Sequence, residues 1–227
     1  MCNIDYINTI SFLDNYDTSS NKNKRTLDLI IQECLFILNE PLKKSNIDTR
    51  KLDKYDQQFL ILLLIYADRK NITIPDSFFL NKNYNKYIDE LRNKYLIFSE
   101  TFILIESEEL IDLNDDELLS FLTNLLYKAE HESVIQYIQK NKLLLSGLLS
   151  YSCQSYMIQL VSTIILLFKF ANISSNHYRD GIEFLKFQHR ENGGFGYINP
   201  LDNNFTEDKI KEFYIINTLF SLLALKF

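Results

Sequence analysis

The stretch at residues 59–67 (FLILLLIYA) most constrains the fold, because as a helix it is apolar on every side. A helix without a polar face is normally surrounded by other helices. The rest of the composition agrees: the chain has 36 Leu and 27 Ile against 2 Val, with 5 Gly and 3 Pro. β-Sandwiches and barrels use more Val and more turn residues. We therefore predict an all-α fold.

Apolar residues recur elsewhere at the spacing of a helix. From residue 27 to residue 38 they follow the pattern i, i+3, i+4, i+7, i+8, i+11, and Pro41 is expected to end this helix. Asn114 and Glu117 have the spacing of a capping box. Eight or nine helices with short links are predicted, which favours antiparallel helical hairpins. Apart from the first, they lie near 52–67, 84–95, 115–128, 132–150, 153–171, 177–190 and 207–226.

The segment from Tyr95 to Ile105 is compatible with two structures. The runs 95–98 and 101–105 could pair as short strands around Ser99 and Glu100. We favour a helix here. No low-complexity linker divides the chain, so residues 1–227 are interpreted as a single all-α domain.

Charge and cysteine usage exclude several function classes. The formal net charge of -6 argues against a nucleic-acid partner, which requires a clustered basic face. Cys2, Cys34 and Cys153 are too far apart for a paired metal site or a disulfide framework. The first residues lack a signal-peptide pattern, and we expect a cytoplasmic protein. Residues 143–176 hold a single charge, Lys169, but serines and glutamines interrupt them. We therefore expect a buried central helix pair there and no membrane span.

Four of the five glycines lie between Gly181 and Gly196. A helix is expected to end near His189, and the chain then turns through residues 192–194, where glycine tolerates positive φ. Phe195 is expected to fold back onto the apolar face of the hairpin, and Pro200 keeps the following loop out of a helix.

This pattern resembles the repeat of the α/α-toroid superfamily, which includes protein prenyltransferase β subunits and squalene and terpene cyclases. Such repeats have a helix ending in Gln, an acidic or amide residue with Gly-Gly-Phe/Trp-Gly, and a second helix. The matching positions are Gln188, Asn192, Gly193, Gly194, Phe195 and Gly196. The resemblance covers residues 177–226 and implies toroid-like repeats over 131–227, with helices of weaker resemblance over 1–130. Because 227 residues are few for six hairpins, a partial or open toroid is expected.

The catalytic motifs of that superfamily are not matched. Tyr151 lies two residues before Cys153, and Ile215 lies where the family's zinc-binding His would fall, so we expect no metal. Residues 112–117 do not have the DxDD spacing of the cyclase acid and are interpreted as a helix cap. No cofactor is predicted. His177, Asp180 and His189 are too far apart along one helix to chelate an ion and are interpreted as surface or capping residues.

These observations lead to three hypotheses. The first is a non-catalytic or degenerate terpene cyclase/prenyltransferase-like protein that binds a peptide or an apolar small molecule, possibly with a protein partner, as an accessory factor in natural-product or peptide-modification biosynthesis. The second is an active isoprenoid cyclase or prenyl transferase, and the third is a helical-repeat scaffold for protein interactions. For the first, the predicted ligand-binding residues are the polar ones on the uncharged helices and the last helix: Tyr151, Gln154, Tyr156, Gln159, Tyr214 and Asn217.

Overall fold

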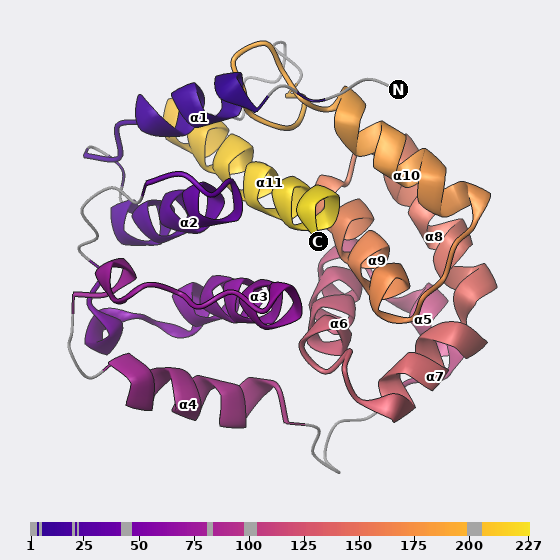
Figure 1. Cartoon of the computed structure of the whole chain (residues 1–227). Helices are drawn as coiled ribbons and strands as arrows, with labels where there is room; N and C mark the ends of the chain where they lie inside the picture. Colours follow the sequence, from indigo (N-terminus) through magenta and orange to yellow (C-terminus); the bar gives the residue numbers. More distant parts are fainter. Residues whose placement is uncertain are drawn as a thin grey trace.

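The computed structural model describes residues 4, 6–19, 21, 23–41, 47–80, 84–97, 104–198 and 206–227. These residues form eleven α-helices and no strand, which confirms the predicted all-α fold (Figure 1). The helices are α1 Ile7–Asp14, α2 Lys24–Ile37, α3 Lys54–Lys70, α4 Tyr84–Tyr95, α5 Ser107–Asp112, α6 Asp115–Tyr127, α7 Glu132–Lys140, α8 Lys142–Gln154, α9 Ile158–Phe170, α10 Asn176–Phe187 and α11 Glu207–Lys226. Two short 3₁₀ helices, Thr49–Lys51 and Asp76–Phe78, lie on either side of α3 in the chain.

Five helices form a cycle of neighbours, which we call the inner ring. α2 packs on α3, α3 on α6, α6 on α9, α9 on α11, and α11 again on α2. The remaining helices lie outside them, with α1 against α2, α4 against α3, and α7, α8 and α10 against α9 (Figure 1). Residues 59–67 of α3 are all buried, as predicted for a helix with no polar face.

The helices of the inner ring share a common direction over most of the ring. Polar contacts near the beginnings of the helices join α2 to α3 and to α11. Contacts near their ends join α3 and α9 to α11. α6 crosses α3: its Tyr127 hydroxyl, at the last helical residue, donates a hydrogen bond to the Gln58 carbonyl near the beginning of α3 (3.4 Å). The beginning of α6 lies beside the beginning of α9. The ring thus has an N-terminal end and a C-terminal end.

Some predicted helix boundaries were wrong. α1 and α5 were not predicted, and the helix predicted over 132–150 is two helices that meet at Asn141. The Asn141 amide nitrogen donates to the Tyr137 carbonyl (3.0 Å), and its oxygen accepts from the Ser107 hydroxyl. A side chain that bonds the backbone in this way competes with the helical ladder. The helix predicted from residue 153 begins at Ile158, because Tyr156 has a left-handed φ of 58°.

The other corrections concern helix ends. α2 ends before Pro41, at a left-handed Asn39 with φ 61°, where the Glu40 N–H donates to the Leu35 carbonyl (2.9 Å). α4 ends at Tyr95, and residues 96–97 and 104–105 are not helical, so the helix preferred over 95–105 was wrong there. Residues 98–103, where the alternative strand pairing would turn, lie outside the described residues, as do Cys2 and Pro200. The Asn114–Glu117 capping box is confirmed at the start of α6.

Candidate ligand-binding site

The glycine-rich loop, residues 188–196, is a packed joint between α10, α1 and α11. Gly193 has a φ of +92° and lies so close to α1 that a Cβ there would be 2.0 Å from the Asn8 carbonyl oxygen. Only glycine combines this φ with such a close approach. The buried Phe195 donates its N–H to the Thr218 hydroxyl of α11 (3.2 Å). The Phe195 side chain is fully buried at the α10–α11 hairpin, which agrees with the prediction that it folds back onto this hairpin.

The other motif residues hold this loop together. The Gln188 carbonyl accepts from the Gly196 N–H (3.0 Å), and the Asn192 side-chain oxygen accepts from the Gly194 N–H (3.1 Å). His189 hydrogen-bonds through Nε2 to the Thr9 hydroxyl of α1 (2.9 Å). The motif thus joins α1 to α11 through contacts that lie outside the inner ring.

A recess opens at the N-terminal end of the inner ring. Its larger part, about 380 Å³, lies at the beginnings of α6 and α9 and against α11. Its smaller part, about 180 Å³, continues between α6 and α3. Asp116, Leu119 and Gln159 line both parts. The larger part is also lined by Asp115, Tyr156, Met157, Ile158, Leu160, Phe213 and Asn217, and the smaller by Tyr55, Gln58, Phe59, Leu62, Ser120, Thr123, Asn124, Tyr127 and Phe220.

Two carboxamides meet on the wall of the recess. The Gln159 Nε2 group donates to Asn217 Oδ1 at 3.5 Å, which joins α9 to α11. The Asn217 side chain is 2% exposed and has no other hydrogen bond within the described residues. Whichever way the two amides are turned, one N–H₂ donor group and one carbonyl acceptor remain free beside each other.

The recess gathers three of the six residues predicted to bind a ligand. Tyr156, Gln159 and Asn217 line its larger part. Tyr214 packs against Gly194 of the glycine loop. Tyr151 and Gln154 are exposed on α8 and do not line the recess. The sequence places these polar residues on the correct helices but does not show which face of each helix is directed towards the recess.

The sequence prediction missed the acidic rim of the recess. Asp115 and Asp116 had been assigned only a capping role, yet both line the larger part. They lie in the first turn of α6, where the helix dipole favours acids. No Lys or Arg is among the described residues that line either part. The sequence signal that could have identified this rim is the pair of acidic residues at a predicted helix start, with no basic residue nearby in the sequence.

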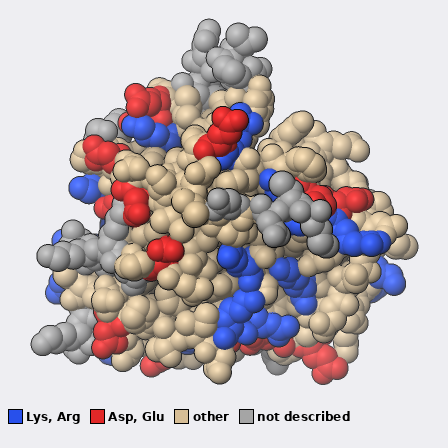
Figure 2. All heavy atoms as spheres, turned by 45° about the horizontal axis from the view of Figure 1, so that its top comes forward, with Lys and Arg blue, Asp and Glu red and all other residues tan. Residues whose placement is uncertain are grey.

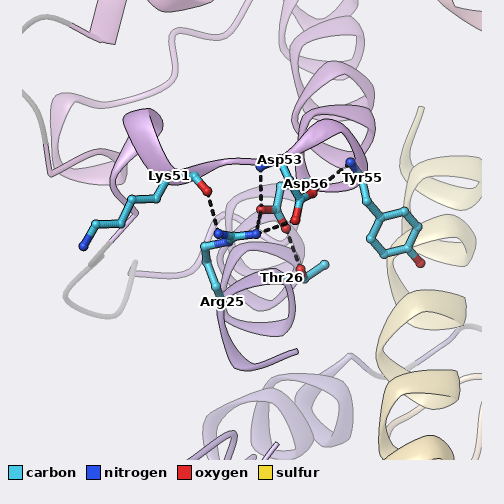
Figure 3. A network of polar contacts seen from close by, with 6 residues as sticks. All are labelled: Arg25, Thr26, Lys51, Asp53, Tyr55 and Asp56. Carbon is cyan, nitrogen blue, oxygen red and sulfur yellow. Dashed lines mark hydrogen bonds and ion pairs between the residues drawn. The ribbon is translucent and has the colours of Figure 1, made fainter. Parts of the chain in front are cut away.

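A polar network fixes the beginning of α3 at the edge of the recess (Figure 3). Arg25 of α2 forms ion pairs with Asp53 (2.5 Å) and with the fully buried Asp56 (2.6 Å), which also accepts a hydrogen bond from Thr26. Asp53 caps α3, and the Asp56 N–H holds the pKa of Asp53 below its usual range. The Asp53 carboxylate also accepts a hydrogen bond from the Tyr55 N–H (2.9 Å). This bond orients Tyr55, which lines the smaller part of the recess.

Glu33 of α2 is a fully buried carboxyl group near this network. Neither of its oxygens has a hydrogen-bond partner within the described residues. Burial, with a smaller contribution from Asp56, raises the pKa of Glu33 well above its usual value. Glu33 in turn contributes to the raised pKa of Tyr127, which burial mainly causes. Burial therefore favours the protonated form of Glu33, which lies close enough to Tyr127 to influence its pKa.

The C-terminal end of the inner ring has a different character. The Phe227 ring packs against Phe170 (centroids 5.0 Å apart) and Tyr66 (6.0 Å), and Arg69 lies over the Phe170 ring (5.3 Å). Lys169 donates to the Ala224 carbonyl (2.8 Å), and burial lowers its pKa to about 8. In Figure 2, Lys and Arg side chains gather below the centre of the visible face. Aromatic rings and cations thus cover this end.

The described residues do not form a metal or nucleophile centre. They contain no group of three His, Cys, Asp or Glu side chains that could hold a metal ion. Burial raises the pKa of Cys153 to about 11, which disfavours a free thiolate nucleophile at neutral pH. His177 bonds to Ser150 and His189 to Thr9, so the two histidines have separate structural partners.

Another cavity, of about 360 Å³, lies between α3 and α4. Arg92 and Asp68 line it and pair with each other through two hydrogen bonds. Their polar groups are therefore already satisfied, unlike those of the recess.

Comparison with other proteins does not assign a function. No protein-family model, curated protein or solved structure matches the chain. Among the described helices, none has the length and apolar character needed to cross a bilayer.

Proposed function

We propose that this chain binds a peptide in the recess at the N-terminal end of its inner ring. It would be a non-catalytic or degenerate relative of the terpene cyclases and prenyltransferases, acting as a cytoplasmic accessory factor in peptide-modification or natural-product biosynthesis. The observation that carries this proposal is the Gln159–Asn217 pair. The pair keeps one free donor and one free acceptor, on a wall that is otherwise largely apolar.

A peptide bond matches this pair chemically. Its carbonyl accepts from one carboxamide while its N–H donates to the other, so both free groups are satisfied. A buried amide such as that of Asn217 is costly to leave without a partner. The larger part of the recess, about 380 Å³, is in the range of small-ligand sites.

The alternative of an active isoprenoid cyclase or prenyl transferase has less support. A diphosphate substrate requires cationic groups or metal ions to offset its charge. The described lining of the recess carries Asp115 and Asp116 and no Lys or Arg. A prenyl diphosphate would therefore meet repulsion at the rim.

Two features support the toroid-like part of the proposal. The five inner helices make a cycle of neighbours, as expected for a toroid with one inner helix per hairpin. The glycine loop ties α10 and α11 to α1, so the ends of the helix series meet. A ring of six hairpins has six inner helices, and the five found here would agree with a chain of only 227 residues.

Binding of a peptide mixture tests the proposal. We expect a fluorescein-labelled heptapeptide mixture, randomised at five positions, to raise fluorescence polarisation saturably with the wild-type protein. The double variant Gln159→Leu/Asn217→Leu should weaken binding at least tenfold, because it removes both free polar groups. Gln154→Leu makes a similar change outside the recess and should bind like wild type.

Circular dichroism and Tm establish that the variants are folded. If the buried leucine at position 217 prevents folding, Gln159→Leu alone provides the test, since Gln159 is only partly buried. Unchanged binding in a folded variant would count against this site. Product formation from farnesyl or geranylgeranyl diphosphate, with Mg²⁺ or Zn²⁺ present, would favour the enzyme alternative instead.

A further inference from the structure

Two carboxylates lie in the recess without partners. Asp115 and Asp116 line its larger part, and neither side chain has a hydrogen bond or an ion pair within the described residues. Acids at a helix start are explained by the helix dipole alone and do not by themselves make a binding site. A second observation is needed.

Asn217 supplies that observation. It lines the same part of the recess, is 2% exposed, and its only side-chain hydrogen bond is the 3.5 Å contact with Gln159. A buried amide with a free polar group, in the same recess as two unpaired carboxylates, is an arrangement that a ligand would complete. The apolar wall beside these groups is formed by Leu119, Ile158 and Leu160.

We infer that the recess binds a basic peptide, with a Lys or Arg side chain at Asp115 and Asp116 and its neighbouring peptide bond at Gln159 and Asn217. A guanidinium group donates to carboxylates in a fixed, bidentate geometry. The methylene stem of the same side chain can cover apolar surface. This inference rests on the proposed function, since it specifies which peptides bind.

A matched pair of labelled probes tests the inference. Both are acetylated heptapeptide mixtures with randomised apolar flanks; one has a central arginine and the other a central citrulline, which is neutral and nearly identical in shape. We expect the wild-type protein to bind the arginine mixture about tenfold more tightly, and 0.5 M salt to reduce that preference. Asp115→Asn/Asp116→Asn should remove the preference and leave citrulline binding unchanged.

A control separates local from general charge effects. Glu108→Gln/Glu109→Gln removes the same charge from exposed positions on α5 and should keep the preference. Equal binding of both mixtures by the wild-type protein would overturn the cation site while the proposed peptide binding stands. Binding of neither mixture would overturn both. A preference that survives the aspartate substitutions would refute the assignment to Asp115 and Asp116.

Discussion

The two ends of the inner ring differ in charge, packing and exposed polar groups. The N-terminal end carries the recess, the unpaired Asp115 and Asp116, and the incompletely bonded Asn217. The C-terminal end is filled by aromatic rings, and lysines there donate to backbone carbonyls of α11 and to the Phe227 oxygen. One end is open and lined with unpaired polar groups, and the other is closed by packed rings.

The shared helix direction explains much of this difference. Helices that run the same way place their N–H groups at one end and their free carbonyls at the other. Acids are favoured at the first end and cations at the second. Lys169 and Lys70 satisfy carbonyls within the protein, whereas the charges of Asp115 and Asp116 remain available.

Phe170 and Phe213 give the largest expected contrast between the ends. Phe170→Ala removes a ring that is 4% exposed at the closed end and should lower the free energy of unfolding by about 3–5 kcal/mol. Phe213→Ala, at a half-buried residue that lines the recess, should lower it by about 1 kcal/mol. Urea unfolding measures both. Equal losses would contradict the distinction between a packed end and an open one.

The glycine loop gives the next largest effect. Gly193→Ala should lower the free energy of unfolding by about 3 kcal/mol, because it combines a left-handed φ with a clash against α1. Gly147→Ala is the matched control: this glycine lies inside α8 with open space around it, and alanine there should stabilise by about 0.5–1 kcal/mol. If Gly193→Ala is as stable as wild type, the loop does not tie α1 to α11 as described.

The smallest effect concerns Lys169 at the closed end. Its pKa is about 8 in the folded protein, below the roughly 10.4 of an unfolded chain. Between these values the folded state binds fewer protons, so the free energy of unfolding should rise with pH. One proton accounts for at most about 1.4 kcal/mol per pH unit, and partial exposure reduces this. In urea titrations from pH 7.5 to 10, the free energy of unfolding of wild type should rise relative to that of Lys169→Met, whereas the exposed Lys209→Met should follow wild type. A difference between wild type and Lys169→Met that stays constant or shrinks with pH would contradict the lowered pKa.

The sequence predicted helices better than it predicted the site. The periodic stripes of α2 and α3 and the capping box of α6 were sufficient, because they depend on contacts within a few residues. The break between α7 and α8 was missed because Asn141 has a partner in Ser107, which is distant in sequence. Tyr151 and Gln154 lie outside the recess for a similar reason, since helix faces are decided by packing.

The sequence by itself determined the fold class and the glycine loop, because apolar periodicity and the demand for positive φ are local properties of the chain. Only the tertiary structure decided that Asp115 and Asp116 line the same recess as Gln159 and Asn217, which are distant in the sequence. Their proximity results from the packing of α6, α9 and α11 around a common core. Packing between separate helices places side chains in space, and no short-range pattern encodes it.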